Sequence, residues 1–435
     1  MEQELSIAEL DSSTSVRLAG FLSVNVGQDA RITFSDVLCC PHLVAPVFAL
    51  IDTYRTRGMK IAVVAPERSA VARALLGSED ERPFGKVYRF DTTDEYLRIF
   101  KRVQTEVLKL PNVGKGFRVA FEWCISEVMD NVIQHSGANG GYFMVQYLPK
   151  ERLLKTAVFD LGIGICAALK GSRFSPDNAE DAIRLAVEPN VTSGNGQGNG
   201  LFGLREIVKQ SRNGRLQITS GGAKYVLTTG AGGRTEPSVG PADALPGFAG
   251  TTLVDFQVVL DDSLSIDRVF DDALPTTDLW LEDHELDEAT VAVRVLEIVP
   301  ETVSRDFGRE MRQAVENLID NEHRRVIVDF SGVDMCSSAF VDEFIGKLLV
   351  KYQFVNFSRM IGFHALGGLP ALLINHSIKQ RLSEEESATG EVAMDSTGAH
   401  DMGPMGPAVP QSSNGEIPTQ DVRVDDQPVI VNALP

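Results

Sequence analysis

The chain is poor in cysteine, in long apolar runs and in basic residues relative to acidic ones. Its five cysteines (Cys39, Cys40, Cys124, Cys166 and Cys336) form no CxxC pair and no Cys/His pairing at zinc-ligand spacing. This argues against a disulfide framework and a structural zinc site. No apolar run is long enough to cross a bilayer, and the acidic start MEQELSIAELDSS lacks a signal-peptide core. We therefore expect a cytoplasmic protein with no membrane partner.

The excess of acidic over basic residues indicates which binding partners are unfavourable. With 41 Lys and Arg against 60 Asp and Glu, the formal charge is −19, which would repel phosphate backbones. We therefore expect no nucleic-acid partner. Part of the charge lies at the C-terminal end, where Gly, Pro, Ser and Asp are abundant. Residues 384–435 are predicted to be a disordered acidic tail, because such a composition cannot bury enough apolar surface.

The order of predicted strands and helices indicates an α/β fold with several domains. Residues 1–17 are predicted to be an N-terminal extension, and 18–105 alternate strands with helices. Residues 106–262 contain the candidate site, 263–288 form an acidic linker, and 289–383 again alternate strands with helices. The first and third of these α/β segments look alike, which suggests a divergent internal duplication.

A polar stripe lies on the helix predicted near 116–135. Glu127, Asn131 and His135 are four residues apart and therefore share one face, beside an apolar ridge that can face the core. An amide oxygen is a suitable ligand for Mg²⁺, and a carboxylate one turn earlier could deprotonate a nucleophile. The alternative is a solvated helix face.

A second motif follows a predicted apolar strand. Asp160 ends LLKTAVFD, and a buried carboxylate at a strand end is costly unless it binds something. It could accept a hydrogen bond from the exocyclic amine of adenine. Gly162 and Gly164 would let the backbone turn tightly beside a ligand. An ordinary turn is the alternative.

Glycines alternate in TSGNGQGNGLFG, at Gly194, Gly196, Gly198 and Gly200, just before a predicted helix. Free backbone N–H groups and a helix N-terminus favour anions, so this segment fits a lid over a triphosphate. Gly198, Gly200 and Gly203 also match a dinucleotide GxGxxG, but no strand directly precedes them and no acid follows at the required distance. Thr251 and Thr252 open a later strand, and their hydroxyls could reach the same pocket.

Together, and in this order, these motifs resemble the N, G1, G2 and G3 boxes of the GHKL family, which includes anti-sigma factor kinases, histidine kinases, Hsp90-like chaperones and type II topoisomerases. SEVMDNVIQHS (126–136) is especially similar to the N box of anti-sigma serine kinases. The resemblance implies a Bergerat-type α/β sandwich that binds ATP and Mg²⁺. It assigns Mg²⁺ to Asn131, general base catalysis to Glu127 and adenine to Asp160. Gly162 and Gly164 would lie beneath the adenine, and the glycines from 194 to 200 would form the lid.

The segment VDFSGVDMCSSAFVDEFIGKLL (328–349) resembles a STAS-like domain, the fold of anti-anti-sigma factors. The resemblance places Ser337 where those proteins carry a phospho-accepting serine. An Asp usually precedes that serine, and here the residue is Cys336. Ser337 could instead simply cap the helix. Residues 18–105 resemble a degenerate STAS-like domain, with Pro41 and His42 where the serines would stand.

Three functions compete on these grounds. The first is an anti-sigma-type serine kinase or partner switch acting on STAS-like or sigma-like regulators or on its own STAS-like domain. The second is a non-catalytic, ATP-gated interaction scaffold. The third is an ATP-hydrolysing clamp, which is disfavoured because no transducer domain is evident. A homodimer would be in keeping with other GHKL regulators.

Overall fold

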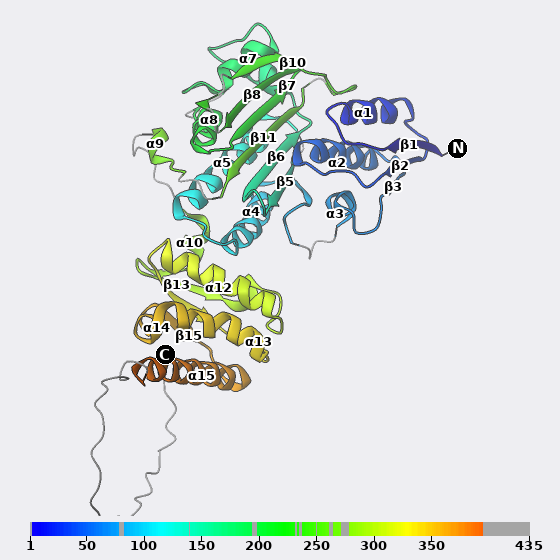
Figure 1. Cartoon of the computed structure of the whole chain (residues 1–435). Coiled ribbons are helices and arrows are strands. Elements are labelled where there is room, and N and C mark those ends of the chain that lie inside the picture. The colour runs from blue at the N-terminus through cyan, green and yellow to red at the C-terminus, as the bar shows by residue number, and fades with distance from the viewer. Residues whose placement is uncertain are drawn as a thin grey trace, which may run out of the picture. The chain divides into compact units, whose positions relative to one another are not determined.

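The computed structural model describes residues 2–77, 82–138, 140–193, 198–230, 233–234, 237–248, 250–260, 264–270 and 278–394 (Figure 1). The chain divides into an N-terminal unit, residues 1–284, and a C-terminal unit, residues 285–435. The fold is α/β, as predicted. Helix α15 (Gly368–Met394) enters the segment predicted as a tail, and residues 395–435 lie outside the described part. None of the described helices combines the length and the apolar character that crossing a bilayer requires.

The N-terminal unit begins with a layer of three parallel strands, which pair in the order β1-β2-β3. These are β1 (Gln3–Ile7), β2 (Ala30–Phe34) and β3 (Ile61–Val64), each followed by a helix: α1 (Thr14–Val24), α2 (Pro41–Thr56) and α3 (Ala70–Leu76). Residues 1–17 are therefore not an extension. They supply the edge strand β1, whose Ile7 is buried, and the start of α1.

A larger antiparallel sheet follows, with strand order β10-β8-β7-β11-β6-β5-β4 and β9 beside β8. Its strands are β4 (Val87–Phe90), β5 (Gly141–Leu148), β6 (Leu153–Asp160), β7 (Arg215–Ser220), β8 (Ala223–Gly230), β9 (Gly233–Arg234), β10 (Ser238–Pro241) and β11 (Thr252–Val259). The helices of this part are α4 (Thr93–Leu108), α5 (Lys115–His135), α6 (Gly164–Lys170), α7 (Ala179–Ala186) and α8 (Gly200–Gln210).

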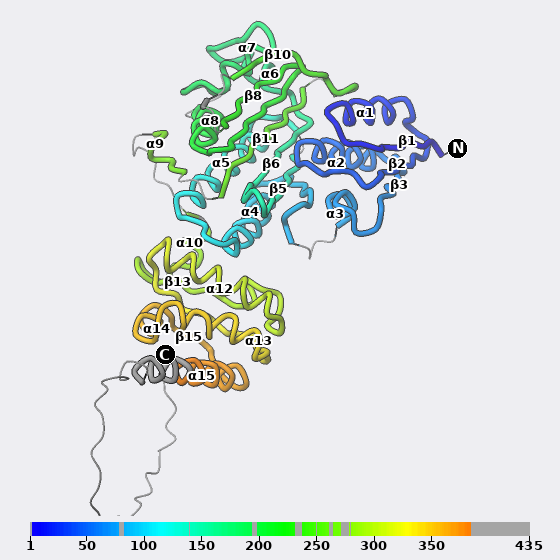
Figure 2. The backbone as a smooth tube through the Cα atoms, in the orientation of Figure 1, coloured from blue at the N-terminus to red at the C-terminus, as the bar shows by residue number. Residues whose placement is uncertain are grey.

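The predicted boundary at residues 105/106 is misplaced. Strand β4 pairs with β5, so the chain enters the larger sheet after α3 and before α4, two helices that Figure 2 labels. The cause is apolar burial, because Phe90 packs in the helix-covered core while Val87 faces the N-terminal layer. The 18–105 segment therefore does not form a domain separate from the larger sheet.

Strands β5 and β6 of the larger sheet are buried on both faces along most of their length. Successive residues of β5 point to opposite faces, as in any strand. Phe143 and Val145 pack in the core that includes α4, α5 and α8, whereas Tyr142 and Met144 pack with the N-terminal layer. Helix α2 lies on this second face, where the Asp52 carboxylate accepts a hydrogen bond of 2.8 Å from the Tyr142 hydroxyl. This double burial explains the nearly continuous apolar run GYFMV in β5.

The predicted acidic linker is largely packed in its described parts, residues 264–270 and 278–284, which we call the connector. Leu264 and Ile266 are buried in the helix-covered core. Helices α9 (Asp267–Phe270) and α10 (Leu279–His284) follow, and Trp280 of α10 is 1% exposed. Asp278 forms a buried ion pair with Arg118 of α5. The connector therefore packs through its buried apolar residues, although its composition is acidic.

The C-terminal unit contains a sheet of order β12-β13-β14-β15, in which β12 is antiparallel and the others are parallel. Its strands are β12 (Glu285–Asp287), β13 (Thr290–Arg294), β14 (Arg325–Asp329) and β15 (Ile361–His364). Besides α15, its helices are α11 (Val295–Ile298), α12 (Arg305–Asp320), α13 (Ser338–Val341), a π-helical turn (Asp342–Gly346) and α14 (Lys347–Met360). Strands β13 to β15 and their helices follow the same sequential order as β1 to β3, which agrees with the suggested duplication.

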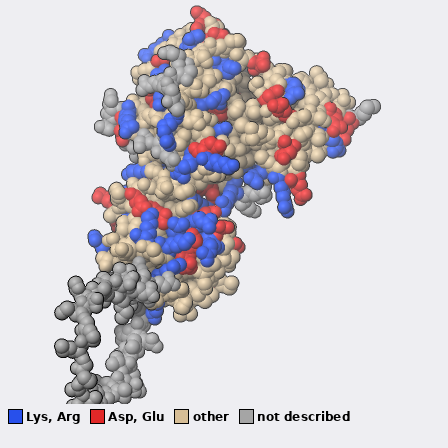
Figure 3. All heavy atoms as spheres, in the orientation of Figure 1, with Lys and Arg blue, Asp and Glu red and all other residues tan. Residues whose placement is uncertain are grey.

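Charges of both signs alternate on the surface of the C-terminal unit (Figure 3). Lys351 of α14 pairs with Asp320 of α12 at 2.6 Å, and Lys347 of α14 pairs with Glu343 of the preceding π-helical turn at 2.7 Å. Glu343 is buried and also lies within 4 Å of three arginines of α12. The Lys347 ammonium, followed by Arg312 and Arg309, holds the pKa of Glu343 below its ordinary value despite burial. These pairs form an ionic seam between the helices.

Candidate functional site

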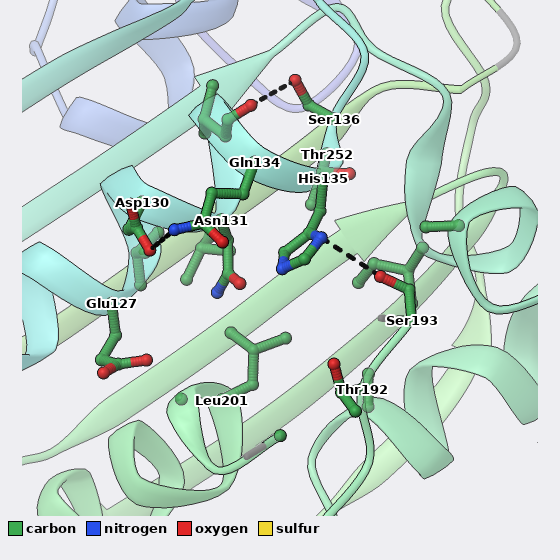
Figure 4. Close-up of a pocket in the computed structure, with 18 of the residues that line it drawn as sticks. Glu127, Asp130, Asn131, Gln134, His135, Ser136, Thr192, Ser193, Leu201 and Thr252 are labelled. Atoms are coloured by element: carbon green, nitrogen blue, oxygen red, sulfur yellow. Dashed lines mark hydrogen bonds between the residues drawn. The ribbon is translucent and has the colours of Figure 1, made fainter. Parts of the chain in front are cut away.

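A cavity of about 480 Å³ lies over the larger sheet. It is lined by the C-terminal half of α5, the ends of β6 and β11, helix α6 and residues 191–193 and 198–201 (Figure 4). A cavity of this size accommodates a small-molecule ligand or cofactor. Most of the residues that the sequence motifs single out in the N-terminal unit line this one cavity.

The polar stripe of α5 enters the cavity as its spacing predicts. Glu127, Asn131 and His135 all line the cavity, and Figure 4 shows them projecting from the same helix. The neighbouring ridge, which includes Ile125 and Val132, is buried in the core. The stripe thus lines the cavity, while the apolar ridge beside it faces the core.

Glu127 lies where α5 meets the start of α8. A Cβ atom added to Gly200 would lie 2.5 Å from the Glu127 Oε2 atom, so the first residue of α8 is in close contact with the carboxylate. Burial raises the pKa of Glu127, and the nearby Asp130 carboxylate raises it further. A carboxylate with a raised pKa is a better proton acceptor than an ordinary one.

Asp160 forms the other polar end of the cavity. It is 4% exposed, and its Oδ1 atom accepts a hydrogen bond of 2.9 Å from the Gly162 N–H. Burial raises the pKa of Asp160 to about 7. Thr252 of β11 is its direct neighbour across the strands, and it also lines the cavity. The turn after β6 therefore retains a buried carboxyl group beside a hydroxyl group.

The glycine turn after Asp160 is fixed to the end of α5. The Ile163 N–H donates a hydrogen bond of 2.7 Å to the Ser136 carbonyl oxygen. A Cβ atom at Gly162 would lie 2.2 Å from that same oxygen, so only glycine allows this approach. Gly164 lines the cavity, whereas Gly162 lies behind it and shapes the turn.

The glycine-rich segment is described only at its two ends. Gly198 and Gly200 line the cavity, while Gly194 and Gly196 lie outside the described residues. The two ends are joined by a hydrogen bond of 3.1 Å from the Val191 N–H to the Gly198 carbonyl oxygen. The Ser193 hydroxyl lies 3.3 Å from Nδ1 of His135, which connects this segment to α5.

A residue that the motifs miss lines the cavity, and two described residues that they include, Gly162 and Thr251, do not. Strand β11 begins at Thr252, one residue after Thr251. The Ser220 hydroxyl lies 3.2 Å from that of Thr252 and accepts a 2.9 Å hydrogen bond from the Ile165 N–H. Trp123 lines the cavity one turn before Glu127. The i−4 spacing could have indicated Trp123, but Ser220 required knowledge of the strand pairing.

The described lining of the cavity carries acidic groups and no Lys or Arg. Its carboxylates are Glu127, Asp130 and Asp160. In the described part of the chain, the cavity included, no three His, Cys, Asp or Glu side chains gather as a cluster of metal ligands. An anionic ligand in this cavity would therefore depend on a bound cation and on backbone N–H groups.

Ser337 lies in the C-terminal unit and caps α13. Its hydroxyl accepts a hydrogen bond of 3.0 Å from the Phe340 N–H and donates one of 2.7 Å to the Val303 carbonyl oxygen. The hydroxyl thus serves as both donor and acceptor within the C-terminal unit, as expected of a helix cap. The neighbouring Ser338 is exposed.

Comparison with known proteins identifies part of the C-terminal unit. Residues 308–366, from α12 to just beyond β15, match the model of a STAS-like domain of unknown function (DUF4325). This match confirms the STAS-like prediction for the segment. No curated protein matches the chain.

The similar solved structures include ATPase regions of type II topoisomerases. The ATPase region of Saccharomyces cerevisiae topoisomerase II is 16% identical over 33% of this chain and 38% of that one, with a TM-score of 0.19. The ATP-binding domain of Francisella tularensis topoisomerase IV is 16% identical over 31% and 36%, with a TM-score of 0.20. The B subunit of Myxococcus xanthus DNA gyrase is 11% identical over 39% and 43%, with a TM-score of 0.22.

The chain thus spans less than half the length of each of these three structures. They belong to the class that the motifs resemble. The assignment of the N-terminal unit rests on its own residues.

The pKa of Asp160 gives the ligand-free protein a characteristic pH dependence. The folded state holds the Asp160 proton up to about pH 7, whereas an ordinary Asp releases it near 3.8. The folded state therefore binds more protons between these values, and stability falls as the pH rises through this window. We predict that the free energy of unfolding of the wild type, minus that of Asp160→Asn, decreases by about 2 to 4 kcal/mol from pH 4 to pH 8.

Urea unfolding of both proteins across this pH range measures the difference. The Asn amide oxygen can still accept the Gly162 N–H, so the turn keeps its hydrogen bond. The exposed Asp177→Asn is the matched control for the substitution itself. A difference that does not vary with pH would contradict the buried environment assigned to Asp160.

Proposed function

We propose that the cavity binds ATP together with Mg²⁺ and that the chain is an ATP-dependent signalling regulator of the GHKL type. The observation that carries this proposal is the buried Asp160 carboxyl group, which shares one cavity with the stripe of Glu127, Asn131 and His135. One end offers an acceptor for the exocyclic amine of adenine, and the other offers oxygen ligands for a cation.

The residues present fit both groups. Asp160 would accept the adenine amine, with Thr252 and Ser220 beside it. The Asn131 amide oxygen would hold Mg²⁺, which supplies the positive charge that the described lining lacks. The phosphates would lie near the N-terminus of α8, where backbone N–H groups favour anions. Gly198 and Gly200 occupy that end of the cavity.

The reaction favoured by this arrangement is phosphoryl transfer to a protein serine. Glu127 would accept the proton of the attacking hydroxyl group, a role that suits a partly buried carboxylate of raised pKa. The STAS-like C-terminal unit supports a substrate or partner of the same STAS-like class. We extend the proposal to two further partners of the chain, namely sigma-like regulators and a second copy of the chain itself.

One observation favours a second function, an ATP-gated scaffold without catalysis. The Ser337 hydroxyl is engaged as a helix cap, and Cys336 stands where an acceptor segment usually has Asp. Under this alternative, ATP occupancy controls which protein is held, and no phosphate is transferred. The two functions share the same ATP site and differ only in the fate of the γ-phosphate.

Removal of the proposed Mg²⁺ ligand tests the site. We predict that Asn131→Ala weakens binding of Mg·ATP by roughly 100-fold, because the amide oxygen is lost while the helix keeps its buried ridge. In EDTA, the wild type should bind ATP as weakly as Asn131→Ala binds Mg·ATP. Calorimetric titration measures all three affinities, and Asn213→Ala, at an exposed loop position, is the control. Unchanged affinity in Asn131→Ala would overturn the assignment.

Loss of the proposed base separates the two functions. We predict that Glu127→Gln binds Mg·ATP within about threefold of the wild type but transfers phosphate at least about 100-fold more slowly. The assay uses γ-labelled ATP, the full chain and its Ser337→Ala variant, followed by phosphopeptide mapping. The exposed Glu151→Gln is the matched control. Transfer that survives in Glu127→Gln excludes this residue as the base, while ATP binding without transfer or hydrolysis in the wild type favours the scaffold.

A further inference from the structure

Helices α5 and α8 approach closely at two points along the cavity. Gly200 lies against Glu127, and Gly203, one turn later on α8, lies against Trp123, one turn earlier on α5. A Cβ atom at Gly203 would lie 2.2 Å from the Trp123 Cη2 atom. The two helices therefore run in opposite directions, and the position of α8 determines the position of the cavity wall at Glu127.

An aromatic residue from outside both helices completes this contact. The ring of Phe270, in the connector, lies 5.4 Å from that of Trp123 in an edge-to-face arrangement. The Phe270 ring also lies 6.3 Å from that of Phe202, and its Cζ atom would be 2.7 Å from a Cβ atom at Gly203. Phe270 thus packs against the first turn of α8 and against Trp123, which lines the cavity.

The connector is attached to the other end of α8 as well. The Gln210 side chain, at the last residue of α8, donates to the Ser265 carbonyl oxygen and accepts from the Ser265 N–H, both at 2.9 Å. Leu264 and Ile266 on either side are buried. Residues 264–270 therefore extend along α8 from its C-terminal end to the level of Gly203.

We propose that Phe270 is a positioning residue for the ATP site. By packing on Trp123, Phe202 and Gly203, it holds the first turn of α8 against Glu127, and with it the Gly198–Gly200 end of the cavity. Phe270 is not among the residues that line the cavity, so it acts through α8 and Trp123. The proposal rests on the proposed function, because the affinity in question is that for Mg·ATP.

Truncation and rescue test this role in the full chain. Phe270→Ala should weaken Mg·ATP binding by roughly 10-fold, the worth of one to two aromatic pairs. Phe270→Tyr should restore affinity to within about threefold. Phe84→Ala is the matched control, since Phe84 is also partly buried on the same core but lies away from the cavity. It should lose stability without losing affinity.

A second measurement does not depend on ATP. Amide hydrogen exchange of the ligand-free protein should become faster at residues 200–204 in Phe270→Ala and remain unchanged there in Phe84→Ala. Equal exchange at 200–204 in wild type and Phe270→Ala overturns the positioning role, as does unchanged affinity. A wild type that binds no Mg·ATP, with faster exchange in Phe270→Ala, refutes the proposed function and leaves the placement of α8 by Phe270 intact.

Discussion

The burial of the Asp160 carboxyl group is the constraint on which the site depends. A carboxylate that is 4% exposed and has one backbone N–H donor is unfavourable in the ligand-free protein, as its raised pKa indicates. Neighbouring strands place Thr252 and Ser220 beside it, and the following turn is fixed to the end of α5. The sheet thus holds a buried hydrogen-bond acceptor, and a ligand that donates a hydrogen bond to it would offset the free-energy cost of its burial.

Close backbone approaches connect this end of the cavity to the other. Gly162 brings the turn against Ser136 at the end of α5, and Gly200 brings α8 against Glu127. Helix α5 therefore presents Glu127 and Asn131 to the cavity. The turn after β6 and the start of α8, which border the cavity on either side, both pack closely against this helix. The N-terminal layer covers the opposite face of the sheet, so the strands that position Asp160 are buried on both sides. Rigidity of this kind is what a preorganised polar site requires.

Local patterns were predictable from the sequence, and long-range pairings were not. The four-residue spacing of Glu127, Asn131 and His135 determines a shared helix face, and the apolar run before Asp160 predicts a buried strand. The partners of that strand are set by tertiary contacts, so the Ser220–Thr252 pair and the assignment of β4 to the larger sheet escaped prediction. In the connector, the acidic composition obscured the buried Leu264, Ile266 and Trp280. The lid glycines Gly194 and Gly196 remain predictions.

The central claim is that one cavity holds adenine at Asp160 and Mg²⁺ at Asn131. A crystal structure of the full chain grown with Mg²⁺ and a non-hydrolysable ATP analogue tests it most directly. We expect the adenine amine within hydrogen-bonding distance of Asp160, the metal on the Asn131 amide oxygen and the phosphates at the start of α8. An analogue bound elsewhere, or bound in this cavity with its base away from Asp160, would contradict the account.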